Sequence, residues 1–132
     1  MNIEYLNTLP AVENKFSVDL QNGERVVFTA ELDTFGTEKD RMLGMGSKLT
    51  LTNQRIIANN GPGIWTIDIF EDVKSCGKVE YKKLFGLLKG VYFAVDLNEE
   101  LVFDSGKQKL TGFHFYFNAE DTAKFGEIVN HI

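Results

Sequence analysis

The sequence predicts a mainly β domain, in which about seven or eight short antiparallel strands form a partly open barrel capped by one C-terminal α-helix. Apolar residues alternate with polar residues in several short windows separated by turn residues, and this two-residue period is typical of half-buried strands. After Asn118 the apolar residues change to a helical period. These two patterns together indicate one sheet-based core closed by a helix.

Each window predicts one strand, from Gly23 onward. The predicted strands are residues 26–32, 43–52, 55–57, 65–69, 73–81, 91–97, 101–103 and 113–117. The segments between them contain Gly, Asn, Asp and Glu, and we expect a loop at 33–40, a hairpin turn at 59–63, a short hairpin loop at 98–100 and a turn at 105–110.

The last segment predicts a helix whose apolar stripe is formed by Phe125, Ile128, Val129 and Ile132. Asn118 is the expected N-cap, because its side chain can accept a hydrogen bond from the first turn. At the other end of the chain, residues 1–22 show no clean period and Pro10 interrupts any helix. We expect this lead-in to dock on a single domain formed by residues 23–132.

Composition narrows the class of protein. A chain of 132 residues with 43% hydrophobic content suits one compact core. No apolar run approaches the roughly 20 residues that span a bilayer, and no basic and apolar leader is present. With a single cysteine, Cys76, the sequence predicts a cytoplasmic protein without an internal disulfide.

The net charge of −5 argues against nucleic acid as a partner. Residues 74–89 nevertheless form a local basic zone on the acidic chain, because Glu80 is their only acid. The five lysines of this zone are Lys74, Lys78, Lys82, Lys83 and Lys89.

Few residues are paired as an enzyme would need them. Cys76 lies between two lysines but has no base near it in sequence, so we interpret it as a packing residue. Glu127 and His131 are four apart on the predicted helix, which favours a solvated surface pair over a metal half-site. His114 is expected on the face opposite the phenylalanines of its strand. We therefore predict no enzymatic activity, metal or cofactor.

The segment 81–90 is the candidate binding site. It places four large apolar residues between lysines, in a segment predicted as a loop or a single helical turn. We expect the apolar residues to cap the open end of the barrel; the alternative is a loop that dips into a membrane with its lysines on anionic headgroups. The candidate residues for a partner or a membrane are Lys74, Lys78, Lys82, Lys83, Phe85, Leu87, Leu88 and Lys89.

Residues 44–57 read Gly-Met-Gly-Ser-Lys-Leu-Thr-Leu-Thr-Asn-Gln-Arg-Ile-Ile, and Asp72-Val73 follows the next strand. This pattern resembles GRAM domains and the bacterial pleckstrin-homology-like proteins related to them. The resemblance implies a pleckstrin-homology-like fold over residues 23–132 and a role in binding lipid, phosphoinositide or protein. In phosphoinositide-binding members the first hairpin loop is basic, whereas here Lys39 and Arg41 are opposed by Asp33, Glu38 and Asp40.

Three functions remain open from the sequence. The leading one is a non-enzymatic interaction module that binds a protein partner or self-assembles through an exposed sheet edge. The second is peripheral binding to anionic membrane lipid through residues 82–89, assisted by Lys74 and Lys78. The third is a small-ligand carrier or an enzyme that uses the barrel mouth, where a large pocket would hold Tyr92, His114 or Tyr116.

Overall fold

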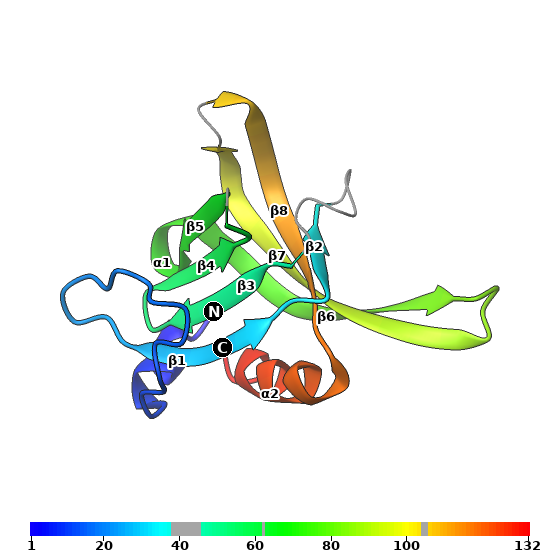
Figure 1. Cartoon of the computed structure of the whole chain (residues 1–132), viewed down its shortest axis with the longest axis horizontal. Helices are drawn as coiled ribbons and strands as arrows, with labels where there is room; N and C mark the ends of the chain where they lie inside the picture. Colours follow the sequence, from blue (N-terminus) through cyan, green and yellow to red (C-terminus); the bar gives the residue numbers. More distant parts are fainter. Residues whose placement is uncertain (38–45, 62, 104–105) are drawn as a thin grey trace.

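The computed structural model describes residues 1–37, 46–61, 63–103 and 106–132. Within these residues the protein is mainly β, with two four-stranded antiparallel sheets and a C-terminal helix (Figure 1). Sheet A has the order β1-β3-β4-β5, and sheet B has the order β2-β8-β7-β6. The strands are β1 (Val26–Glu31), β2 (Thr34–Gly36), β3 (Lys48–Thr52), β4 (Arg55–Asn59), β5 (Ile64–Asp68), β6 (Val73–Lys83), β7 (Leu88–Phe103) and β8 (Gln108–Tyr116).

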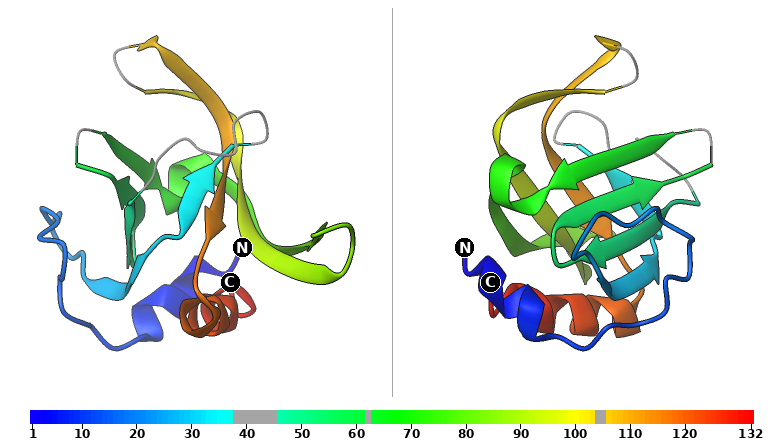
Figure 2. Two further views of the ribbon diagram at one scale, coloured as in Figure 1. Left: turned by 45° about the vertical axis from the view of Figure 1, so that its right-hand side comes forward. Right: turned by 90° about the vertical axis from the view of Figure 1, so that its left-hand side faces the viewer.

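The chain passes between the sheets at two corners. Only two residues separate β1 in sheet A from β2 in sheet B, and the short helix α1 (Ile69–Asp72) joins β5 to β6. In the described residues no strand pairing crosses either corner, so the sheets do not close into a barrel. The helix α2 (Ala119–Val129) lies beneath β1, and the two chain ends meet beside it (Figure 2).

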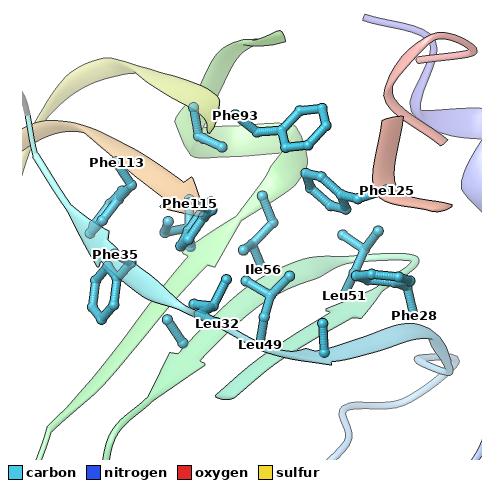
Figure 3. Packing of buried hydrophobic residues seen from close by; sticks show 14 of the residues in the cluster. Phe28, Leu32, Phe35, Leu49, Leu51, Ile56, Phe93, Phe113, Phe115 and Phe125 are labelled. Carbon is cyan, nitrogen blue, oxygen red and sulfur yellow. The ribbon is translucent and has the colours of Figure 1, made fainter. Parts of the chain in front are cut away.

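The core lies between the two sheets and the helix (Figure 3). Phe35, Phe93, Phe113 and Phe115 are fully buried, because alternate residues of β2, β7 and β8 point to the same inner face. From α2, Phe125 enters this cluster with its ring centroid 4.8 Å from that of Phe93. Asn118 caps α2 by accepting a hydrogen bond from the Asp121 amide at 2.8 Å, as predicted.

Three sequence predictions about local structure were wrong. The predicted loop at 33–40 contains β2, which pairs with the end of β8. The predicted hairpin loop at 98–100 lies inside one continuous strand, β7, whose pairing with β8 is merely irregular between Asp96 and Leu101. Strand β3 is covered on both faces, since Thr50 and Thr52 are as buried as the leucines between them. Residues 38–45, which include Lys39, Arg41, Gly44 and Met45, fall outside the described residues.

Candidate functional site

Strands β6 and β7 continue past the rest of sheet B as a two-stranded hairpin, which we call the arm (residues 79–92). Its strands pair from Val79 opposite Tyr92 to Lys83 opposite Leu88. Pairing between β7 and β8 begins only at Phe93 opposite Phe115, so β8 does not accompany the arm. The arm therefore projects from the body of the protein (Figures 1 and 2).

The arm ends in a tight turn with positive φ angles. The Leu87 amide donates a hydrogen bond to the Leu84 carbonyl at 3.1 Å, and the two residues between them have φ of 57° at Phe85 and 84° at Gly86. Positive φ at both central residues matches the twist of a two-stranded hairpin. This conformation is easy for Gly86 but unusual for the large side chains of Leu84 and Phe85.

The end of the arm is apolar and exposed. Phe85 is 105% exposed and Leu87 is 82% exposed, and Leu84 and Leu88 are also exposed. We call these four residues the apolar tip. The prediction that they cap the open end of a barrel was wrong, because the hairpin carries them away from the core. Large apolar side chains gathered at one exposed turn are typical of a surface that meets a partner or a membrane.

Three lysines lie directly behind the apolar tip, and we call Lys82, Lys83 and Lys89 the lysine collar. All three are exposed, and none forms an ion pair within the described part of the chain. Lys82 lies directly opposite Lys89 across the hairpin. Like charges in this position destabilise strand pairing, so a negative charge brought to the collar would relieve the repulsion.

The structure separates the other two predicted lysines from this group. Lys78 and Lys74 are exposed on β6, but they precede Phe85 by seven and eleven residues. At about 3.3 Å per residue they lie roughly 23 and 36 Å from the end of the arm. The collar and the tip form one site, and Lys74 and Lys78 belong to the body of sheet B.

Aromatic rings brace the base of the arm. Tyr81 on β6 is paired with Gly90 on β7, and its ring lies directly over that glycine. A Cβ added at Gly90 would come within 2.2 Å of the ring. Its centroid is 5.8 Å from that of Tyr92 and 6.0 Å from that of Tyr116. Gly90 is thus required by the close approach of the ring, and the ring anchors the arm to β8.

Replacement of Gly90 by alanine is expected to loosen the arm and leave the core intact. The new methyl group displaces the Tyr81 ring, at a cost of about 1–3 kcal/mol for overpacking. Arm amides should then exchange with deuterium about tenfold faster or more, since 1.4 kcal/mol is a factor of ten. The matched control is Gly77→Ala on the partner strand β6, where an added Cβ meets nothing within 4 Å. Equal exchange rates in both variants would contradict this role for Tyr81.

The residues weighed for catalysis or metal binding do not assemble into a site. Burial, with a smaller contribution from the charge of Asp96, raises the pKa of the Cys76 thiol to about 12, so the thiol is protonated at neutral pH. Glu127 on α2 and His131, two residues beyond the end of that helix, form an exposed pair with their side chains 3.9 Å apart. No group of three metal-ligating side chains occurs among the described residues.

The aromatic residues weighed for a small-ligand site lie on the outer face of sheet B. His114 and Tyr116 alternate with the buried phenylalanines of β8, and the Tyr92 ring centroid is 4.4 Å from that of His114. The inner face is occupied by the phenylalanine cluster. These rings therefore flank the base of the arm instead of lining the space between the sheets.

The motif at residues 52–55 has a structural role that its sequence did not reveal. Arg55 binds the buried Glu24 carboxylate with two hydrogen bonds, at 2.6 Å and 2.8 Å, and also donates to the Asp19 carbonyl at 2.7 Å. The Asn53 side chain accepts a hydrogen bond from the Arg25 amide at 2.9 Å. The turn between β3 and β4 therefore holds the lead-in against the sheet.

Comparisons with protein-family models, with curated proteins and with solved structures gave no match to this chain. None of the helices in the part of the chain that the structure describes is both long and apolar enough to cross a membrane.

Proposed function

We propose that the protein is a non-enzymatic interaction module that binds the surface of an anionic membrane through the arm. The observation that carries this proposal is the exposure of Phe85 and Leu87 at the end of a projecting hairpin, directly in front of three lysines that form no ion pair with any described residue. The apolar tip would enter the acyl boundary of the bilayer, and the lysine collar would lie among the anionic headgroups.

The energies are sufficient for reversible binding. Burying one Phe or Leu side chain contributes about 1.5–3 kcal/mol, and each lysine near an anionic surface contributes about 1 kcal/mol. Two deeply inserted side chains and three lysines therefore supply roughly 6–9 kcal/mol, before the cost of association. The apolar side chains can supply this burial energy because they are exposed in the free protein and not already buried in its core.

A lipid surface fits the arm better than a strand-pairing protein partner does. Strand β6 is an edge strand of sheet B along its whole length, and it pairs only with β7 in the described residues. Exposed lysines recur along this edge at Lys74, Lys78, Lys82 and Lys83, and such lysines oppose the addition of another strand. Binding of a protein or self-assembly through the tip is the competing outcome that the experiment below separates.

We further propose that the fold is pleckstrin-homology-like and that the chain is related to GRAM domains. This proposal is supported by the order of seven or more antiparallel strands followed by one helix, and by the sequence of residues 49–55, Leu-Thr-Leu-Thr-Asn-Gln-Arg. The membrane proposal does not depend on this relationship, because one fold hosts many functions.

Sedimentation with vesicles tests the membrane proposal. The protein should sediment with vesicles that contain phosphatidylglycerol, should bind neutral vesicles at least about tenfold more weakly, and should lose affinity as salt rises. The reason is that the collar supplies roughly 3 kcal/mol at low salt, and charges near the surface are screened when the Debye length falls to about 3 Å at 1 M. Light scattering without vesicles provides the control. A stable oligomer that ignores vesicles of either composition would contradict membrane binding and favour self-assembly.

A further inference from the structure

A notch of about 520 Å³ opens where the arm leaves the body. It lies beside residues 89–91 of β7, at the position where β8 no longer pairs with that strand. The remaining walls come from the end of β6, the start of β2, the end of β8 and the first turns of α2. The side chains that matter for its chemistry are Asp33, Thr34, Tyr81, Lys83, Lys89 and Tyr116.

Charges of both signs line this notch. Lys83 and Lys89 belong to the lysine collar, and Asp33 is an exposed carboxylate that forms no ion pair within the described residues. A ligand that is only anionic would be repelled by Asp33, and a ligand that is only cationic would be repelled by the lysines. The walls therefore suit a ligand that carries a negative group and a positive group.

The charges also follow a definite order along the arm. Asp33 lies at the base, where its amide donates a hydrogen bond to the Tyr116 carbonyl at 2.8 Å, and the Tyr116 ring is 5.2 Å from that of Tyr92. Lys89 is three residues nearer the tip than Tyr92, a distance of about 10 Å along the strand. From the end of the arm inward, the order is apolar tip, lysines, then carboxylate with tyrosines.

A phospholipid presents the complementary order when its headgroup joins a phosphate to an ammonium: acyl chain, phosphate, ammonium. We propose that the notch binds such a headgroup, an inference that rests on the proposed membrane function. Lys83 and Lys89 bind the phosphate, while Asp33 and the rings of Tyr81 and Tyr116 bind the ammonium. The Thr34 hydroxyl, which is buried and has no hydrogen-bond partner among the described residues, adds a polar group to the same wall.

Soluble headgroups test this site without the membrane. Phosphocholine and phosphoethanolamine are titrated separately against inorganic phosphate and choline, with the amide resonances of residues 89–91 as the readout. At least one of the two phosphoesters should bind about tenfold more tightly than inorganic phosphate or choline. Phosphate alone would contact only the lysines, and choline alone would contact only the carboxylate and the tyrosine rings. Asp33→Asn should abolish this advantage, and the matched control Glu31→Gln, an exposed acid on β1 outside the notch, should retain it. Equal affinity for phosphoester and phosphate, or an unaffected Asp33→Asn variant, would overturn the assignment.

Vesicles separate a lipid ligand from a free one. At a fixed fraction of phosphatidylglycerol, the remaining lipid is either phosphatidylcholine or phosphatidylethanolamine, or a neutral glycolipid without phosphate. We expect tighter binding to one of the ammonium-bearing mixtures, and equal binding to all three in Asp33→Asn. Wild-type protein that binds all three vesicles equally would overturn the notch assignment alone. Wild-type protein that binds no vesicle would overturn the membrane function together with the lipid assignment, even where soluble phosphocholine binds.

Discussion

The double variant Phe85→Ser/Leu87→Ser is expected to lose about 100-fold or more of its affinity for anionic vesicles while its stability is unchanged. The two side chains contribute about 1.5–3 kcal/mol each when buried in the acyl boundary, and a loss of at least about 3 kcal/mol corresponds to two decades of affinity. Stability is unaffected because both side chains are exposed in the free protein and contact no part of the core.

A matched control distinguishes insertion of the apolar tip from non-specific binding of exposed apolar residues to the vesicles. Ile64 and Phe70 are 61% and 74% exposed, and they lie on β5 and α1, away from the arm (Figure 1). The variant Ile64→Ser/Phe70→Ser removes similar apolar area from the body and should bind vesicles as the wild type does. Vesicle sedimentation and urea unfolding are measured on both variants. Equal loss of binding in the two would contradict a specific role of the tip, and unfolding of the tip variant would contradict its exposure.

The apolar tip shows where sequence patterns reach their limit. Leu84, Phe85, Leu87 and Leu88 have the composition of a core cap, and a period of two cannot be recognised across a four-residue turn. Whether such residues face inward depends on how far β6 and β7 extend beyond β8, which is a property of the whole sheet. The lysines and Gly90 were visible in the sequence, but the cross-strand contact between Gly90 and Tyr81 was not.

The strands themselves were predicted best where one face is buried. Phe113, Phe115 and Phe117 alternate cleanly with His114 and Tyr116, and the structure buries the first set as expected. Prediction failed at residues 98–100, because turn-forming residues were accommodated in the long strand β7 as an irregularity in its pairing. It also failed for Thr50 and Thr52, because polar residues that alternate with apolar ones predict an exposed face, whereas both threonines are buried and the Thr52 hydroxyl donates a hydrogen bond to Glu24.

The short segment that joins the lead-in to β1 is held by a buried ion pair between Glu24 and Arg55, and Arg55→Ala is expected to cost about 3–5 kcal/mol of the free energy of unfolding. The Glu24 side chain is 0% exposed, and Arg55 supplies two of its hydrogen bonds. Among the described residues, removal of the guanidinium leaves the buried carboxylate with two hydrogen-bond donors, the Thr52 hydroxyl at 2.7 Å and the Gln21 amide at 2.8 Å. For a domain whose total stability is typically about 5–15 kcal/mol, this is a large fraction.

The pH dependence of the unfolding free energy tests whether the buried charge of Glu24 causes the loss of stability in Arg55→Ala. Burial raises the pKa of Glu24, but hydrogen bonds from Arg55, Thr52 and the Gln21 amide outweigh it and hold the pKa below its ordinary value of 4.5. The pair therefore stabilises the wild type above that value, and this stabilisation is lost as the pH falls through the folded pKa. In Arg55→Ala, protonation instead relieves the unpaired charge, so the difference in unfolding free energy between the two proteins should narrow from neutral pH to about pH 3.5.

Urea unfolding of three proteins completes the test. The double variant Glu24→Gln/Arg55→Met removes both charges together, and it should be more stable than Arg55→Ala at neutral pH because no unpaired ion stays buried. The difference in unfolding free energy between the double variant and the wild type should be smallest at acid pH, because protonation of Glu24 weakens the wild-type ion pair there. If Arg55→Ala and the double variant lose equal stability at every pH, the lead-in is held by packing and neutral hydrogen bonds, and the ion pair between Glu24 and Arg55 is not what fastens it to the turn between β3 and β4.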